Sequence, residues 1–529
     1  MPQPRIMFEN DSRHTLTYMY EPPIQKEEYE AAIDELLGTP VEALVFNLGY
    51  GNAFLHGTEV GDRWGPDAAA TEPFRPGGGR QWEHLVFHRA YRNAKKLIDE
   101  DNDPLHIICN HAHANGMLVY PSLQVQAAGL PHLSLGARGD LDPDFPGFNL
   151  ADFKHGEVRD QRFALIEEVV NKYDVDGFEL NLNHYAGGGF FHPDEVEEGR
   201  VIMTEWVGRI RDALRKSKPD AELAVRVPTS IEACLSLGFD LGVWAGQGIV
   251  DILMGENFGL TSIVDPTADF RPLMEVARGS ACRVHAIIRN NLDTDRLDVA
   301  PIEMMRATAS NYWAQGVDGL CPVHWYGNWP YGPPFYEQMR ELPHPHVMAV
   351  RDKFYSIPTP PGRSQGQMIT ESGITMQLPA DLEVGKTVRL NLPISDDLPR
   401  WDRVGRVHEV LLRIRVMRAT EVDRFRFALN GVELPADLMR KINHNYMLNA
   451  PRYRAHSSYW YIFKLDRDHW PDRGDNAVEV SLLERDPEVT PEIFVRDVEL
   501  EIKYLKGKSG YRGVHNTDPD LGPYERASQ

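Results

Sequence analysis

The sequence predicts an α/β protein: a (β/α)8 barrel followed by an antiparallel β-sandwich. Two observations carry this prediction. Up to about residue 355, eight short apolar runs alternate with helical patterns, which is the strand count of a (β/α)8 barrel. Beyond residue 366, apolar and other residues alternate with a period of two, which is typical of antiparallel strands. An open doubly wound sheet is the alternative, but no Gly-rich phosphate turn follows the first run.

The eight expected barrel strands lie at 6–10, 43–50, 117–124, 176–183, 222–228, 250–256, 284–290 and 318–325. Helices are expected over 160–172 and 200–215, where apolar residues recur every three or four positions. A further helix is expected to open at Thr229, with Glu232 completing a capping box. Another has Pro301 in its first turn, where a missing N–H costs nothing.

Four consecutive parts are expected along the chain. The barrel takes 1–356, a Pro-rich linker 357–365, the sandwich 366–505 and a loose polar tail 506–529. Within the sandwich, Asn430-Gly431 directly follows an alternating run and predicts a hairpin turn.

Composition and charge exclude several classes of protein. The 529 residues include 56 basic and 78 acidic side chains, a net charge of −22, so we expect neither a nucleic-acid nor a membrane-surface partner. No run approaches the ~20 apolar residues of a membrane span, and the first residues do not resemble a secretory signal. Four widely spaced cysteines suit a reduced compartment, so a cytoplasmic, disulfide-free protein is expected. No exposed heptad or apolar stripe predicts an oligomer.

The strand at 176–183 is the most informative segment. Successive side chains of a strand point to opposite faces, and one face here is apolar and suits packing under helices. The other face carries Glu179, Asn181 and Asn183, which must then point to the barrel axis or its mouth. A buried polar group without a partner costs roughly 1–3 kcal/mol. These side chains therefore form either a satisfied structural network or part of a binding site.

Other strand ends converge on the same mouth. Polar and aromatic side chains are expected there, either on the inward face of a strand or just past its end. They are Glu9, Asp11, Asn47, Tyr50, Gln124, His184, Arg226, Glu256, Arg289, His324, Trp325 and Tyr326. Amides and carboxylates can bind sugar hydroxyls, and aromatic rings can stack on the C–H faces of a pyranose.

Cleavage of a glycosidic bond needs two carboxyl groups, one as general acid and one as nucleophile or base. Glu179 and Glu256 are the expected catalytic pair because both fall near strand ends, and Glu9 and Asp11 are the reserve candidates. The remaining convergent residues are expected to bind substrate. We expect no metal, because three or more Asp, Glu and His do not gather at consecutive strand ends, and we expect no cofactor. His111 and His113 are expected to be capping or core residues.

Three segments resemble a known group of proteins. They are the opening IMFENDS, 169–185 with VVNKYDVDGFELNLNHY, and 225–254. They are similar to bacterial glycoside-hydrolase-like proteins related to the family-10-like barrels. The resemblance implies a barrel, a carbohydrate substrate and Glu179 as a site residue. That group carries an acidic residue where this chain has Asn181, so the second carboxylate is here displaced or absent.

The expected function is therefore a glycoside hydrolase that cleaves an oligo- or polysaccharide with two carboxyl groups. One alternative is a polysaccharide lyase, in which Asn181, Asn183 or Arg226 neutralises a uronate and a nearby His or Tyr removes a proton. The same residues would also suit a non-catalytic sugar-binding protein, or an isomerase or epimerase. The segment YWYIF at 459–463 is expected to be core, or alternatively a platform on which sugars stack.

Overall fold

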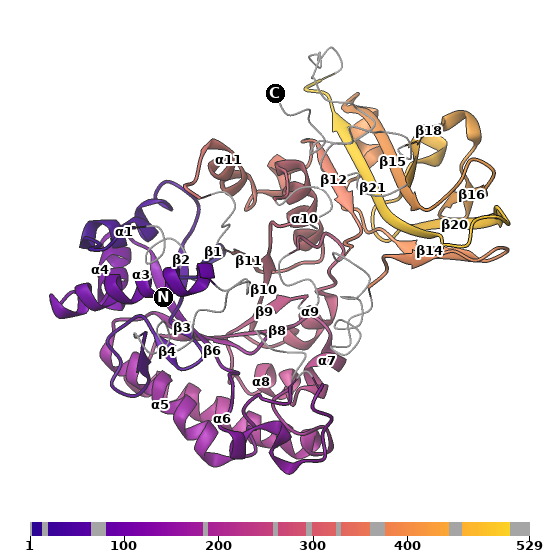
Figure 1. Ribbon diagram of the computed structural model, residues 1–529. Helices are drawn as coiled ribbons and strands as arrows, with labels where there is room; N and C mark the ends of the chain where they lie inside the picture. Colours follow the sequence, from indigo (N-terminus) through magenta and orange to yellow (C-terminus); the bar gives the residue numbers. More distant parts are fainter. Residues whose placement is uncertain are drawn as a thin grey trace. The chain divides into compact units, whose positions relative to one another are not determined.

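The computed structural model (Figure 1) describes residues 3–12, 20–64, 81–145, 147–183, 189–257, 263–292, 299–323, 329–359, 376–443 and 458–507. The chain forms two compact units that interleave along the sequence. Unit 1 comprises Met1–Phe258, Phe270–Ile287 and Val317–Tyr331, and unit 2 comprises Gly259–Asp269, Ile288–Gly316 and Gly332–Gln529. The chain thus passes from one unit to the other five times. The predicted boundaries at 356, 365 and 505 stay a prediction.

Unit 1 contains the barrel, an eight-stranded parallel sheet in the order β1-β2-β6-β7-β8-β9-β10-β11. Its strands are β1 (Met7–Asn10), β2 (Ala43–Asn47), β6 (Leu118–Gln124), β7 (Gly177–Asn181), β8 (Glu222–Pro228), β9 (Ile252–Glu256), β10 (Arg283–Ile288) and β11 (Gly319–Pro322). Parallel bridges from Ile6 to Leu320 and from Glu9 to Val323 join the first strand to the last. The predicted barrel is confirmed.

The helices of unit 1 are α1 (Lys26–Asp34), α3 (Gln81–Asp99), α4 (Pro104–Ala114), α5 (Gly156–Lys172), α6 (Val196–Ser217), α7 (Ile231–Ser236), α8 (Leu241–Gly246) and α9 (Arg271–Ala277). After β2 the chain adds a small sheet of β3 (Gly49–Tyr50), β4 (Ala53–Phe54) and β5 (Asp62–Arg63). In α6, the apolar stripe that predicted the helix is buried, as Met203, Trp206 and Ile210 show.

One predicted helix start is wrong by a residue. The hydroxyl of Ser230, and not that of Thr229, caps α7 by accepting a hydrogen bond from the backbone N–H of Ala233. Glu232 is consequently the second residue of the helix and cannot complete a capping box with Thr229. Both Thr229 and Ser230 are good N-caps, so sequence alone did not separate them.

Unit 2 contains α10 (Ile302–Ala314), α11 (Pro333–Glu341), α12 (Pro345–Met348) and α14 (Leu398–Arg403) together with two antiparallel sheets. The first sheet has the order β12-β21-β15-β19-β18, with β13 paired to β21, and the second has the order β14-β20-β16-β17. Their strands are β12 (Lys353–Ser356), β13 (Ala380–Asp381), β14 (Thr387–Asn391), β15 (Val407–Met417), β16 (Arg424–Leu429), β17 (Val432–Glu433), β18 (Met439–Asn443), β19 (Ser458–Lys464), β20 (Ala477–Glu484) and β21 (Phe494–Tyr504). The predicted antiparallel β-domain is confirmed.

The alternating residues of the sandwich enclose one core. Leu412 and Ile414 on β15 and Val480 on β20 are buried in the same cluster. Asn430-Gly431 forms the predicted turn between β16 and β17, with positive φ angles of 52° and 80°.

The alternative of a sugar-stacking platform at 459–463 is wrong. Tyr459, Trp460 and Tyr461 are each 3% exposed, and Phe463 is 1% exposed, so no ring there presents a free face. Aromatic residues of an antiparallel strand bury a large apolar area, and β19 uses them for packing.

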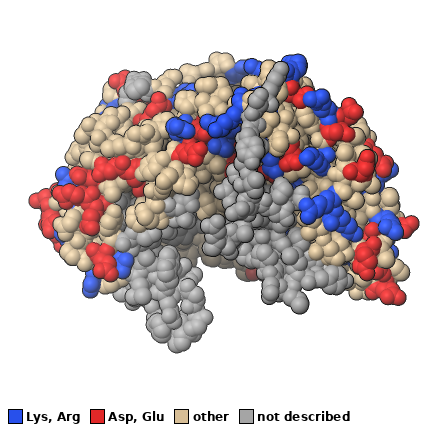
Figure 2. Space-filling view, turned by 90° about the horizontal axis from the view of Figure 1, so that it is seen from above, with Lys and Arg blue, Asp and Glu red and all other residues tan. Residues whose placement is uncertain are grey.

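The described surface carries charges of both signs (Figure 2), and the four cysteines are buried. On the face drawn in Figure 2, Lys and Arg side chains lie among Asp and Glu on the described residues. Cys109, Cys234, Cys282 and Cys321 are all buried free thiols. In the described part of the chain, no helix is both long and apolar enough to cross a bilayer. Residues 360–365 of the predicted linker, 366–375 of the predicted sandwich and 508–529 of the predicted tail lie outside the described residues.

Candidate functional site

Strand β7 presents Glu179 to the barrel interior, as the alternation predicted. Phe178 and Leu180 are fully buried on its other face, whereas Glu179 forms an ion pair with Arg226 of the neighbouring strand β8. Asn181 lies beside Arg226 in the register of the two strands and accepts a hydrogen bond from the N–H of Asn183. All of these polar side chains are buried.

Three carboxylates surround the guanidinium of Arg226. Its Nε donates to Glu179 Oε1 at 2.6 Å, and its Nη1 donates to Glu9 Oε2 at 2.7 Å. The same Nη1 lies 3.9 Å from Glu256 Oε2. Glu9, Glu179, Arg226 and Glu256 therefore come from four different strands and meet inside unit 1.

Burial and charge act against each other in this cluster. Burial raises the pKa of Glu179, and Glu9 adds to that effect, while Arg226 opposes it. Burial alone would lower the pKa of Arg226, but Glu179, Glu9 and Glu256 hold it well above its usual range. Arg226 thus stays cationic. One cation among three carboxyl groups leaves the cluster anionic unless two of the carboxyl groups carry protons.

The three carboxyl groups lie at different depths. Glu179 pairs in register with Ala224 of β8, whereas Glu256 pairs with Pro228, two inward-facing positions nearer the carboxyl ends of the strands. The Glu179 side chain is fully buried, while the side chains of Glu256 and Glu9 are 6% and 11% exposed. Glu179 is therefore the most buried of the three, and Glu256 lies nearer than Glu179 to the carboxyl ends of the strands.

Several predicted binding residues line the same interior. Asn183 Nδ2 lies 3.4 Å from the backbone oxygen of Glu256, and Gln124 is the neighbour of Asn181 in register. Asp11, just past β1, is buried. Buried polar atoms without a hydrogen-bond partner among the described residues include Gln124 Oε1, Asn183 Oδ1 and Arg226 Nη2. A hydroxyl-rich ligand can satisfy such atoms, which otherwise cost free energy.

Other predicted residues are placed differently or not at all. Asn47 Oδ1 accepts from the N–H of Gly49, so Asn47 shapes the turn after β2. Tyr50 belongs to β3, but its side chain lies outside the described part of the chain, as do the whole residues His184, His324, Trp325 and Tyr326. Arg289 follows β10 and belongs to unit 2.

A second polar network near the amino ends of the strands was not predicted. Tyr120 Oη and Arg283 Nη2 both donate to Glu222 Oε2, at 2.8 and 2.6 Å. His285 is buried among these strands, and burial lowers its pKa to about 3, so it is neutral. The alternation that selected Arg226 also selects Glu222 on the same face of β8 and could have found this network.

The two histidines near the end of α4 are structural, as expected. His111 Nε2 lies 2.7 Å from Asp34 Oδ1, and His113 Nε2 lies 2.8 Å from Asp176 Oδ2. Asp176 also accepts from the N–H of Val119, so His113 belongs to a connection between α4 and the sheet.

One group in the described residues has the spacing of metal ligands: Asp140, His192 and Asp194. Its chemistry does not suit a cation. Arg138 Nη2 already binds Asp140 Oδ2 at 2.7 Å and lies 3.9 Å from Asp194. His192 Nδ1 accepts from the N–H of Asp194, so Nε2 carries the ring proton and points it toward Asp140 at 3.2 Å.

No protein-family model matches the chain, and no curated protein matches it in sequence. Solved structures with a similar arrangement include α-L-fucosidase isoenzyme 2 from Paenibacillus thiaminolyticus, at 15% identity and a TM-score of 0.41 over 66% of this chain and 50% of that one. The chain thus spans about half the length of that fucosidase. The PgaB (BpsB) glycoside hydrolase domain from Bordetella bronchiseptica matches at 11% identity and 0.41, over 64% of this chain and 99% of that one. An Anoxybacillus α-amylase matches at 12% identity and 0.37, over 90% and 98%.

Proposed function

We propose that this protein is a glycoside hydrolase that cleaves an oligo- or polysaccharide within the barrel of unit 1. The observation that carries the proposal is the cluster of Glu9, Glu179 and Glu256 around Arg226. Active sites of (β/α)8 barrels are built at the carboxyl ends of the strands, where Glu256 lies. The family-10-like relationship suggested by the sequence remains part of this proposal.

Glu9 and Glu256 suit the two roles that the reaction needs. Both contact Arg226 Nη1, at 2.7 and 3.9 Å, so their contacting oxygens lie less than about 7 Å apart; this span includes the separation of about 5–5.5 Å found in retaining enzymes. Both are also nearer to solvent than Glu179. Glu179, the most buried of the three, acts by holding Arg226 in place. The pair Glu179 and Glu256, expected from the sequence, remains the competing assignment.

The distances of Glu9 and Glu256 from Arg226 favour one assignment of the two catalytic roles. Glu9 is ion-paired with Arg226 at 2.7 Å and suits the ionised carboxylate, the nucleophile or base. Glu256 lies farther from the guanidinium, at 3.9 Å, and suits the general acid that gives its proton to the leaving oxygen. The polar atoms of Gln124 and Asn183 are available to orient the sugar hydroxyls.

The charge of the cluster favours a neutral sugar. A lyase must neutralise the carboxylate of a uronate, and Arg226 already serves Glu179 and Glu9. Three carboxyl groups around one guanidinium would repel a further anion. Lyase action therefore has weaker support than hydrolysis.

The test is release of reducing ends from a panel of neutral and uronate-containing oligosaccharides by Glu9→Gln, Glu256→Gln and Glu179→Gln. We expect the first two variants to lose about 10²–10⁴-fold in kcat. Glu256→Gln should recover most activity on a dinitrophenyl glycoside, whose leaving group needs no proton. Glu205→Gln, an exposed change on α6, is the control. Unchanged turnover in Glu9→Gln and Glu256→Gln would overturn the assignment, and unsaturated uronate products would indicate the lyase.

A further inference from the structure

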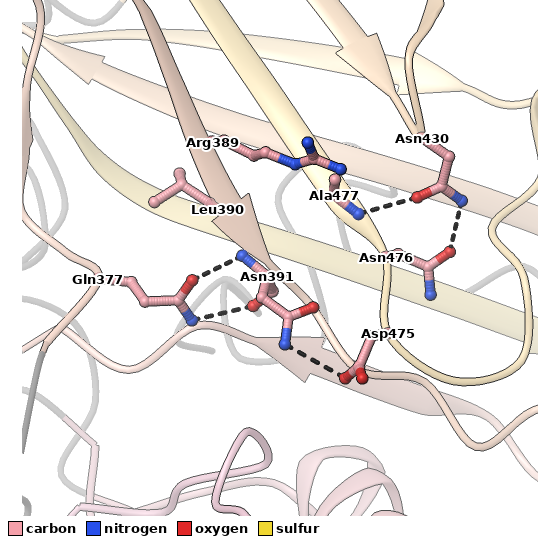
Figure 3. Close-up of a pocket in the computed structure, with 8 residues that line it drawn as sticks. All are labelled: Gln377, Arg389, Leu390, Asn391, Asn430, Asp475, Asn476 and Ala477. Atoms are coloured by element: carbon pink, nitrogen blue, oxygen red, sulfur yellow. Dashed lines mark hydrogen bonds between the residues drawn. The ribbon is translucent and has the colours of Figure 1, made fainter.

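A cavity of about 570 Å³ opens on the four-stranded sheet of unit 2 (Figure 3). Its polar lining consists of four carboxamides, one guanidinium and one carboxylate: Gln377, Asn391, Asn430, Asn476, Arg389 and Asp475. We call it the amide cavity. It is built by unit 2 alone and shares no residue with the cluster around Arg226.

Hydrogen bonds fix one wall of the amide cavity along β14. The Gln377 side chain pairs with the backbone of Asn391: Oε1 accepts from its N–H at 2.6 Å and Nε2 donates to its C=O at 3.0 Å. The side chain of Asn391 in turn donates to Asp475 Oδ1 at 3.2 Å. Figure 3 shows these three residues side by side. Each amide plane is thereby held in one orientation.

The opposite wall is fixed in the same way. Asn430, in the turn after β16, donates from Nδ2 to Asn476 Oδ1 at 2.8 Å and accepts at Oδ1 from the N–H of Ala477 at 2.8 Å. Asn476 is 2% exposed and donates to the backbone oxygens of Asp472 and Gly474. The cavity is therefore organised before any ligand arrives, which lowers the entropy cost of binding.

Hydrogen-bonding capacity remains on the first wall. A carboxamide has two N–H donors and an oxygen with two lone pairs. Gln377 Nε2 and Asn391 Nδ2 each use one donor in the bonds described. The Arg389 side chain is 73% exposed, and its ion pair with Glu479 is 3.8 Å long, so most of its five donors face solvent.

The lining restricts the chemistry of a ligand. Its apolar members are Leu390 and Ala477, and none of its residues is aromatic, so the cavity does not favour an apolar ligand. Arg389 and Asp475 carry opposite charges, so it favours neither a simple anion nor a simple cation. Amides, a guanidinium and a carboxylate at fixed positions suit a neutral ligand whose groups both donate and accept hydrogen bonds. Neighbouring hydroxyl groups of a sugar meet this requirement.

We propose that the amide cavity is a non-catalytic binding site for the neutral sugar residues of a glycan. The inference that this site holds a polymeric substrate on the enzyme rests on the proposed function. The inference that the cavity binds sugar does not. The experiment measures binding of malto-, cello-, xylo- and mannohexaose to the full chain by calorimetry. It is done in the Glu256→Gln variant so that no probe is consumed.

The deciding variant is Arg389→Ala/Asn391→Ala. It keeps the backbone of residue 391 that pairs with Gln377 while removing both side chains. We expect at least tenfold weaker binding of the hexasaccharide that the parent binds. Arg426→Ala is the matched control, since it removes an exposed arginine of the same sheet that does not line the cavity, and we expect no change.

Hydrogen exchange on the Glu256→Gln parent gives a readout that needs no change in the amide cavity. The bound hexasaccharide should slow exchange at 376–378, 389–391 and 475–477. Any of three results would overturn the proposal. None of the four hexasaccharides binds, the double variant binds with the same affinity as its parent, or protection from hydrogen exchange is confined to the barrel strands. Reducing-end release by the wild-type chain is scored separately, so a chain that binds but does not hydrolyse refutes the hydrolase and keeps the binding site.

Discussion

Arg226 and Glu9 are 217 residues apart in the sequence, yet Nη1 of the first donates to Oε2 of the second at 2.7 Å inside the barrel. The contact joins β8 to β1, which are not neighbours in the sheet. Barrel interiors are usually filled by layers of branched apolar side chains. Here part of the interior is held by a buried ion cluster, so both stability and the proposed chemistry depend on one guanidinium.

Replacement of Arg226 by Met should destabilise the protein by about 3–5 kcal/mol, because it leaves Glu9, Glu179 and Glu256 without their cation in a buried space. The loss should shrink as the pH falls and the carboxyl groups take up protons. Urea unfolding at several pH values measures both effects.

Arg209→Met is the control for this prediction. Arg209 forms an ion pair with Asp160 in which the two side chains are 51% and 67% exposed, so its loss should cost at most about 1 kcal/mol. Equal losses of stability in Arg226→Met and Arg209→Met would contradict the view that the buried Arg226 cluster costs more to break than an exposed ion pair.

Glu35 should make stability depend on pH. Burial raises its pKa from 4.5 to about 8, opposed by the hydrogen bond from Trp329 Nε1 at 3.0 Å. Since the folded pKa lies above the unfolded one, this stabilising contribution is complete below pH 4.5 and is lost as the pH rises through about 8. Glu35→Gln keeps an acceptor for Trp329 and removes the dependence.

The variant and the wild type should therefore be nearly equal at pH 5, and the variant should be more stable at pH 9 by on the order of 1–2 kcal/mol, a value reduced for the part of Glu35 that faces water. Thermal unfolding across this range, with the exposed Glu27→Gln in α1 as control, checks the prediction. Parallel pH profiles of wild type and Glu35→Gln would refute it.

Two glycines of α6 should respond to alanine in opposite directions. A Cβ at Gly199 would lie 2.5 Å from the ring of Phe191, so Gly199→Ala should cost about 1–3 kcal/mol through overpacking. A Cβ at Gly208 meets nothing within 4 Å, so Gly208→Ala should stabilise the helix by about 0.5–1 kcal/mol. Denaturant midpoints of the two variants decide, and a change of the same sign in both would contradict the tight packing of Phe191 against α6.

Local patterns predicted the strands well, because the alternation of side chains follows from backbone geometry. The strand expected at 222–228 is β8 with the same bounds, and Glu179 faces inward because Phe178 and Leu180 must face the helices. Helix ends were less certain, since neighbouring Thr229 and Ser230 compete for one cap position.

Contacts between distant strands could not be predicted in the same way. The alternation places Glu9 and Arg226 inside the barrel, but their pairing depends on the tilt and stagger of the strands, which no local pattern contains. For the same reason Glu179 was expected at the mouth, whereas its side chain is the most buried of the three carboxyl groups. The pairing of Gln377 with the backbone of Asn391 likewise depends on a tertiary approach.

The five passages of the chain between the two units limit how the protein can be dissected. A gene fragment ending at residue 356 would encode all eight barrel strands, but it would also carry orphaned pieces of unit 2, among them α10 and β12, deprived of the sheets that they belong with. Such a fragment would expose apolar surface to water and tend to aggregate. No single cut in the gene separates the two units, so neither unit can be duplicated or exchanged as one continuous segment.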